Sequence, residues 1–137
     1  MKAKAPLFLS LEDIEVFHRQ SLREFGGKEG IRDHDGIRAA VMQPEQVYHY
    51  TAGCDLYDIA ATYAFHIAQA QAFLDGNKRT AILAALVFLR VNGKTAIYET
   101  DALYNTMIGF GEKRATRADL AGIFRGVGRR GGDAVSE

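Results

Sequence analysis

Hydrophobic side chains recur at three- and four-residue intervals through most of the chain, which is the spacing of amphipathic helices. In the first such run, Ser10 and Asp13 form a capping-box pattern at the start, and Gly26-Gly27 stops the pattern at the end. The pattern therefore predicts a helix over residues 11–25. Its apolar face consists of Leu11, Ile14, Phe17, Ser21, Leu22 and Phe25.

Two more helices are expected before the middle of the chain. Glycines and aspartates over residues 30–36 indicate a turn, and a short helix is expected over 36–43 because Pro44 disfavours helical geometry in the residue before it. Asp55 can cap a third helix that runs to about Ala70. Tyr48, His49 and Tyr50, between these helices, are interpreted as loop packing, with a substrate-binding lip as the alternative.

The segment 81–89 is apolar on nearly all sides, so a helix over 77–91 is predicted to be the central helix, surrounded by the others. Asn92-Gly93 tolerates the left-handed conformation that ends helices. A short extended segment is expected over 94–98.

Two capping patterns predict the last helices. Thr100-Asp101 is expected to cap a helix to about Ile108, and Thr116 with Asp119 a helix to about Arg125. The fold class is therefore all-α, with about six helices in one domain over residues 1–125. Four glycines follow in the segment 126–137, which predicts a flexible tail.

Composition fits one ordinary globular domain: the 137 residues are 47% apolar and 25% charged. The longest apolar stretch is far shorter than the roughly 20 residues that cross a bilayer, and the N-terminal residues lack the pattern of a secretory signal. Cys54 is the single cysteine, which excludes an internal disulfide and fits a reducing compartment. A cytoplasmic protein without a membrane partner is expected.

Positive and negative charges balance, at 17 each, so an anion site has to be local. The C-terminal arginines are interpreted as a solvated face, with a nucleic-acid-binding helical domain as a remote alternative. These are Arg114, Arg117, Arg125, Arg129 and Arg130.

The polar turn at residues 73–79, set between two apolar helices, is the main anomaly of the sequence. A helix N-terminus presents unpaired N–H groups and the positive end of the helix dipole, so it attracts anions such as phosphate. Lys78 and Arg79 place two cations in that first turn, where the dipole disfavours them unless an anion binds there. Asp75 could hold a magnesium ion that bridges phosphate oxygens. The alternative on local chemistry is a plain Asp-Gly-Asn turn with solvated cations beyond it.

The segment Phe73 to Ala81, followed by Val87 to Gly93, resembles the signature of the Fic/Doc family, and is closer to its Doc branch. Similarity covers roughly residues 8–125. The resemblance implies an α-helical fold, binding of ATP phosphates by the loop and the helix after it, and transfer of AMP, or in the Doc branch phosphate, to a hydroxyl group of a protein. Doc proteins are toxins that modify elongation factor Tu and are neutralised by an antitoxin whose helix completes the fold.

The resemblance also implies roles for individual residues. Asp75 would bind Mg²⁺, and Phe73 would anchor the loop in the core. The phosphate-binding residues would be Gly76, Asn77, Lys78 and Arg79. Ile82 stands where AMP-transferring members carry a second arginine, which favours phosphate transfer. Lys78 is also a candidate catalytic residue.

Gln71 occupies the position of the family's catalytic histidine. That histidine deprotonates the target hydroxyl, and an amide cannot accept a proton near neutral pH. His66 lies five residues earlier on a predicted helix, which rotates it about 140° away, so it is interpreted as a core residue. His18, His34 and His49 show no metal-site spacing and stay unassigned. Two hypotheses remain: a Doc-like transferase impaired by Gln71, and a catalytically silent relative that binds nucleotide or an antitoxin.

Overall fold

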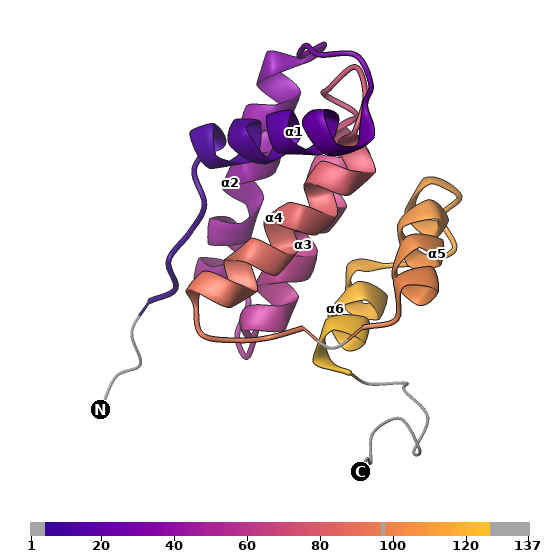
Figure 1. Ribbon diagram of the computed structural model, residues 1–137. Helices are drawn as coiled ribbons and strands as arrows, with labels where there is room; N and C mark the ends of the chain where they lie inside the picture. Colours follow the sequence, from indigo (N-terminus) through magenta and orange to yellow (C-terminus); the bar gives the residue numbers. More distant parts are fainter. Residues whose placement is uncertain (1–4, 97, 127–137) are drawn as a thin grey trace.

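The computed structural model describes residues 5–96 and 98–126, and these form six α-helices (Figure 1). The order along the chain is α1 (Leu11–Phe25), α2 (His34–Tyr50), α3 (Leu56–Ala70), α4 (Asn77–Val91), α5 (Thr100–Gly111) and α6 (Arg117–Arg125). No strand occurs in these ranges, apart from an isolated antiparallel bridge between Ile31 and Phe73. The all-α fold class predicted from the sequence is confirmed.

Helices α3 and α4 form the centre of the molecule. Both carry alanines on their buried faces, and these small side chains let the two backbones approach closely. The alanines are Ala60, Ala61, Ala64, Ala81, Ala84 and Ala85, none of which is exposed. α3 also packs against α2, α5 and α6, whereas α4 packs chiefly against α3 and α1. The central position expected for helix 77–91 is therefore shared with α3.

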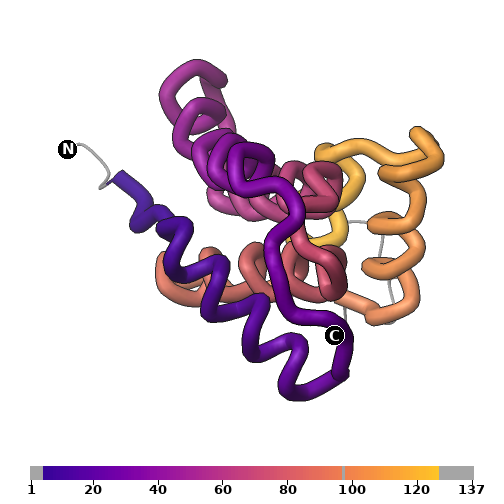
Figure 2. The backbone as a smooth tube through the Cα atoms, turned by 90° about the horizontal axis from the view of Figure 1, so that it is seen from above, coloured from indigo at the N-terminus to yellow at the C-terminus, as the bar shows by residue number. Residues whose placement is uncertain are grey.

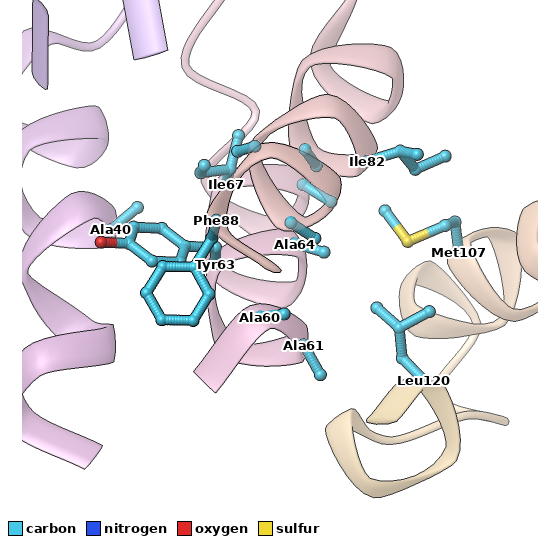
Figure 3. Close-up of a cluster of buried hydrophobic side chains, with 14 of the residues drawn as sticks. Ala40, Ala60, Ala61, Tyr63, Ala64, Ile67, Ile82, Phe88, Met107 and Leu120 are labelled. Atoms are coloured by element: carbon cyan, nitrogen blue, oxygen red, sulfur yellow. The ribbon is translucent and has the colours of Figure 1, made fainter. Parts of the chain in front are cut away.

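Large side chains fill the space on both sides of this pair. Figure 3 shows Tyr63 of α3 beside Phe88 of α4, with ring centroids 5.3 Å apart, and shows Met107 and Leu120 approaching from α5 and α6. The Tyr63 hydroxyl accepts a hydrogen bond from the backbone N–H of Leu9 at 2.8 Å, which ties the N-terminal segment to the core. Burial raises the pKa of Tyr63 to about 12, so its hydroxyl stays protonated.

Capping boxes confirm the predicted starts of three helices. Ser10 with Asp13 caps α1, Asp55 with Asp58 caps α3, and Thr116 with Asp119 caps α6. In each box the first side chain accepts from a backbone N–H one turn later, which satisfies a donor that the helix leaves unpaired. Helices α1, α3, α4 and α6 end within a residue of the predicted positions.

The prediction of a short helix ending before Pro44 is wrong. α2 begins at His34, capped by Asp33, and continues through Pro44 to Tyr50. Proline removes one backbone hydrogen bond from a helix interior. Here the ring is buried and the helix packs along α3, so tertiary contacts offset that loss. The interpretation of residues 48–50 as a loop is wrong for the same reason, since they form the last turn of α2.

The remaining differences lie near the C-terminus. α5 has Glu99 as its N-cap, without a side-chain capping bond, and it runs to Gly111, beyond the expected end at Ile108. Residues 94–96 and 98 form no strand. The predicted tail, apart from Gly126, lies outside the described residues. Within the described ranges, no helix has the length and apolar character needed to cross a membrane.

Two groups of helices flank the central pair. α1 and α2 lie on one side, and α5 and α6 lie on the other (Figure 2). The loop between α3 and α4 lies beside the C-terminal end of α1 (Figure 1). This arrangement places the polar turn singled out from the sequence between α1 and the start of a central helix.

Candidate functional site

The loop of residues 71–76 connects the two central helices through two left-handed backbone positions. Gln71 ends α3 at φ 49°, and Gly76 precedes α4 at φ 81°, a conformation that glycine adopts without steric cost. Between them, Phe73 is completely buried and stacks on the imidazole of His18, with ring centroids 3.8 Å apart and planes 13° apart. Phe73 therefore anchors the loop in the core, as the family resemblance implied.

A second segment, residues 27–33, pairs with this loop in an antiparallel manner. The N–H of Leu74 donates to the carbonyl of Gly30 at 3.1 Å, and the N–H of Arg32 donates to the carbonyl of Ala72 at 2.6 Å. Gly27 lies so close to Asp75 that a Cβ on it would come within 3.0 Å of the Asp75 Cβ. The sequence interpretation treated residues 30–36 as a turn, whereas the structure makes residues 27–33 one wall of the loop.

Gln71 faces solvent at the end of α3. Its side-chain Nε2 donates to the carbonyl of Ala68 at 2.9 Å, so the amide caps the helix. Its backbone carbonyl accepts two hydrogen bonds from the Arg32 guanidinium, at 2.7 and 3.2 Å. Both parts of Gln71 therefore have structural partners, and neither provides a group that accepts a proton near neutral pH.

Asp75 has one carboxylate oxygen engaged and one without a hydrogen bond in the described part of the chain. Oδ2 accepts from the backbone N–H of Lys28 at 2.6 Å. No group of three or more His, Cys, Asp or Glu side chains within the described residues could hold a metal. A single carboxylate suits Mg²⁺, which commonly takes one or two protein carboxylates and completes its shell with substrate phosphates and water.

Asn77 has both side-chain polar atoms occupied by the loop. Its Oδ1 accepts from the N–H of Phe73 at 3.0 Å, and its Nδ2 donates to the carbonyl of the same residue at 2.9 Å. The side chain therefore shapes the loop, and the group that Asn77 offers to an anion is its backbone N–H.

The N-terminus of α4 differs chemically from those of α1, α3 and α6. Gly76 supplies no side-chain cap, and no acidic residue stands in the first turn. Within the described ranges, the backbone N–H groups of Asn77, Lys78 and Arg79 have no hydrogen-bond acceptor. Three donors at the positive end of a helix dipole form an anion-binding arrangement.

The two cations of this turn point in different directions. The Arg79 guanidinium donates to the Ser21 hydroxyl at 3.0 Å and to the carbonyl of Gly26 at 3.3 Å, and it lies 5.0 Å from the centre of the Phe25 ring. Lys78 is exposed and lies about 100° around the helix. Convergence of both cations on one pocket, which the sequence suggested, is therefore not seen in this conformation.

Arg79 borders a groove of about 730 Å³ between α1, α4 and the start of α5. Its apolar floor includes Ile82 and Leu86 of α4, and its rim includes Phe25 and Tyr104, which are 62% and 36% exposed. The sequence suggested no groove here, because its walls come from segments far apart in the chain.

The other residues considered from the sequence lie outside this site. His66 is half-buried in a hollow of about 260 Å³ that includes Gln69 and Ala70 but not Gln71. Burial, together with the charge of Arg117, lowers the pKa of His66, so its ring is mainly neutral at neutral pH.

Two of the C-terminal arginines form salt bridges. Arg125 binds Asp55 and Asp58, each at 2.9 Å, and Arg114 binds Glu112 at 2.6 Å. Arg129 and Arg130 lie outside the described residues. These pairings account for Arg114 and Arg125 without a nucleic-acid partner, while Arg117, at the start of α6, is exposed.

Two residues that contact the loop were not identified from the sequence as site residues: His18 and Arg32. His18 follows Ile14 by four residues on the buried face of α1, so a polar side chain on an apolar face was the available signal. Arg32 is exposed and had no comparable signal.

Comparison with known proteins supports the assignment that the loop suggests. The model of the Fic/DOC family matches residues 8–89. The chain is 28% identical over 117 residues to the protein kinase doc of Escherichia phage P1, covering 85% of this chain and 92% of that protein. It is 44% identical over 70 residues to the toxin Doc of Mycolicibacterium smegmatis (strain ATCC 700084 / mc(2)155), covering 50% of this chain and 54% of that toxin. Because the family model spans more than half of the chain and includes both the 71–76 loop and most of α4, this protein belongs to the Fic/DOC family.

Proposed function

We propose that this protein is a Doc-type toxin of a toxin–antitoxin system that binds ATP and Mg²⁺ and transfers phosphate to a hydroxyl group of a protein such as elongation factor Tu, at a rate lowered by Gln71. The observation that carries the proposal is the uncapped start of α4, where three backbone N–H groups lack acceptors in the described part of the chain. The relatives named as a kinase and a toxin support the same reaction class and role.

Phosphate binding would use main-chain and side-chain donors together. The N–H groups of residues 77–79 offer hydrogen bonds to phosphate oxygens, and the helix dipole favours the negative charge. Lys78 is exposed, so its long side chain can reach a phosphate without breaking an existing contact. Arg79 lines the adjoining groove and would contact the phosphates only after leaving Ser21.

Asp75 is the residue that would hold Mg²⁺. The hydrogen bond from Lys28 fixes one carboxylate oxygen and leaves the other for the ion. A bound Mg²⁺ would neutralise phosphate charge at this position. Ile82, buried in the core at 7% exposure, leaves no second arginine in α4 at that position, which favours phosphate transfer over AMP transfer within the family.

Gln71 limits the chemistry. Loss of a general base costs about 10² to 10⁴ in rate, and the rest of a catalytic site can still supply positioning and electrostatic stabilisation. The second candidate function is therefore a catalytically silent relative that binds nucleotide or an antitoxin. The hydrogen bond from the Gln71 amide to Ala68 favours it, because this side chain serves as a helix cap.

A toxin of this type implies an antitoxin partner, and the groove between α1, α4 and α5 fits a helical segment. Amphipathic helices bind by laying their apolar face into such grooves. Ile82 and Leu86 would meet the apolar face, and Arg23 and Arg79 at the groove would favour an acidic partner residue. Tyr104→Ala is expected to weaken antitoxin binding about tenfold in calorimetry, as for a typical aromatic anchor, while circular dichroism stays unchanged.

Label transfer tests the catalytic proposal. Elongation factor Tu is incubated with γ-labelled or α-labelled ATP and either this protein or its Gln71→His variant. We expect slow γ-label transfer by the protein and a rate about 10² to 10⁴ higher with Gln71→His. Gln71→His combined with Lys78→Ala is the matched control and should lose transfer. Absence of label with both proteins would contradict the transferase function, and α-label transfer would indicate AMP.

Expression in cells separates the two candidates. If the protein as it stands arrests growth while its Lys78→Ala variant does not, the silent-relative function is wrong. If neither arrests growth and Gln71→His does, the protein is a silent member whose site remains intact.

A further inference from the structure

His18 is a buried polar side chain that the proposed chemistry does not use. Its side chain comes from α1, and the residue is 4% exposed. The imidazole stacks on Phe73, and its Nε2 lies 2.8 Å from the backbone carbonyl oxygen of Asp75, 57 positions away in the sequence. Because a carbonyl can only accept a hydrogen bond, Nε2 carries the proton and donates it.

This hydrogen bond sets the direction of the peptide group between Asp75 and Gly76. A trans peptide is planar, and its C=O and N–H point in opposite directions. The carbonyl of Asp75 points toward His18 and α1, so the N–H of Gly76 points away from α1. No acceptor pairs with this N–H among the described residues. It adjoins the three unpaired N–H groups at the start of α4.

The peptide needs such a restraint because it precedes a glycine. Gly76 lies at φ 81°, and glycine can exchange between backbone conformations that other residues avoid. Rotation of this peptide would turn the N–H of Gly76 toward α1 and present a carbonyl oxygen to a phosphate. A carbonyl oxygen at that position would repel an anion.

We propose that His18 is a positioning residue: it holds the Asp75–Gly76 peptide so that the Gly76 N–H becomes a fourth main-chain donor to the phosphate. The inference rests on the phosphate-binding part of the proposed function. α1 would then orient the site through two side chains on one face. Ser21 lies three residues after His18 and accepts a hydrogen bond from the Arg79 guanidinium.

A core-filling role for His18 accounts less well for these contacts. An apolar residue would fill the space behind Phe73 equally well, without the cost of burying an imidazole. The ring stacks on one residue of the 71–76 loop and hydrogen-bonds to another, and its Cδ2 lies 3.6 Å from the position that a Cβ on Gly76 would occupy. Two contacts with the loop, together with this close approach to Gly76, indicate that the ring is placed to order that loop.

Two substitutions separate the hydrogen bond from the packing. His18→Phe keeps an aromatic ring against Phe73 and removes the donor, whereas His18→Gln places an amide N–H near the Nε2 position and removes the ring. Calorimetry measures binding of ATP with Mg²⁺, and adenosine serves as the ligand without phosphates. In parallel, the backbone amide signal of Gly76 in ¹⁵N-labelled protein is followed during titration with inorganic pyrophosphate.

We expect His18→Phe to bind ATP about tenfold more weakly, the size of one lost hydrogen bond, with His18→Gln restoring most of the affinity and adenosine binding unchanged in both. In the wild-type protein and His18→Gln, pyrophosphate should shift the Gly76 signal; in His18→Phe it should not. Equal ATP affinity in wild-type protein and His18→Phe would overturn the inference. Equal losses in both variants would also overturn it, because packing would then explain them.

Failure of the proposed function gives a different result, since the wild-type protein itself would then bind neither ATP nor pyrophosphate. In that case the Gly76 N–H has no phosphate to bind, and the free proteins test the hydrogen bond from His18 to the Asp75 carbonyl on its own. A long-range ¹H–¹⁵N spectrum of the wild-type protein should show His18 protonated at Nε2, and His18→Phe should move the Asp75 carbonyl and Gly76 amide signals. A ring protonated only at Nδ1, or unmoved signals, would overturn it.

Discussion

The N-termini of α3 and α4 lie at opposite ends of the same helix pair and are built in opposite ways. α3 begins with Asp55, whose carboxylate accepts from the N–H of Asp58, and Arg125 binds both carboxylates. α4 begins with Gly76, which supplies no cap, and Lys78 and Arg79 follow in the first turn. The start of α3 has a side-chain cap and acidic residues that balance the dipole within the chain, whereas the start of α4 has neither.

This difference supports the proposed site. α5 also lacks a side-chain cap, but an acidic residue, Asp101, stands in its first turn, whereas α4 has two cations there. A helix start with glycine at the N-cap loses roughly a few tenths of a kcal/mol relative to one with a side-chain cap, and cations in its first turn are unfavourable as well. In this protein α1, α3 and α6 avoid that loss with capping boxes. Among these four helices, α4 alone lacks a side-chain cap, and there the neighbouring segments hold the loop through hydrogen bonds that do not use its first N–H groups.

The largest effect is expected from reversing a charge at the uncapped start of α4. Lys78→Glu should weaken binding of ATP with Mg²⁺ about 100-fold, because it removes one favourable charged contact and adds repulsion. Arg117→Glu is the matched control, since Arg117 is also an exposed cation in the first turn of a helix, α6. It should leave ATP affinity within about twofold in calorimetry. Similar losses in both variants would mean that net charge, and not the start of α4, attracts the nucleotide.

The stability of the loop that precedes α4 is expected to depend on Asn77. Asn77→Ala should lower the free energy of unfolding by about 2 kcal/mol, because the N–H and carbonyl of Phe73 both lose their partner. Asn77→Asp keeps the acceptor for the Phe73 N–H but loses the donor to the Phe73 carbonyl, so in urea titrations it should also be destabilised. Its negative charge should in addition abolish ATP binding. If Asn77→Asp binds ATP normally, the anion does not approach this turn.

The capped start of α3 gives a smaller effect that depends on pH. Burial alone would raise the pKa of Asp55, but hydrogen bonds from Arg125 and from the N–H of Asp58, with the charge of Arg125, outweigh it and lower that pKa below the ordinary 3.8. The ionised carboxylate therefore stabilises the fold above pH 4 and loses this contribution as pH falls through the folded-state pKa.

Asp55→Asn isolates that charge because asparagine is also a good N-cap. We expect the variant to lose about 0.5 to 1 kcal/mol at pH 7, a modest figure because the Asp55 and Arg125 side chains are 48% and 33% exposed. The difference from the wild-type protein should shrink in denaturant titrations as the pH falls below the ordinary pKa of 3.8 and through the lower folded-state pKa. A difference that persists in acid would show that the charge is not its cause.

The smallest effect is expected at Thr80, in the first turn of α4 but inside the core. Its hydroxyl is buried and has no hydrogen-bond partner within the described residues. Replacing an unpaired buried hydroxyl by a methyl group of the same shape removes a desolvation cost. Thr80→Val should therefore raise the melting temperature slightly or leave it unchanged, with ATP affinity unaltered. A clear loss of stability would indicate an unobserved partner for this hydroxyl.

Local rules acting within a few residues determined much of the fold from the sequence. The helices over 11–25, 56–70 and 117–125 follow from apolar spacing and from caps that lie three residues from their partners, and the helix over 77–91 follows from its apolar run. The same rules singled out the start of α4, because cations in a first turn are visible in the sequence alone.

Only the tertiary structure decided what surrounds that turn. α2 continues through Pro44 because it packs on α3, and Arg79 turns toward Ser21, 58 positions away. The pairing of residues 27–33 with the loop, and the hydrogen bond from His18 to Asp75, likewise join distant positions. Such contacts depend on how the helices pack against one another, and the spacing of residues within one helix carries no information about which distant backbone group it will meet.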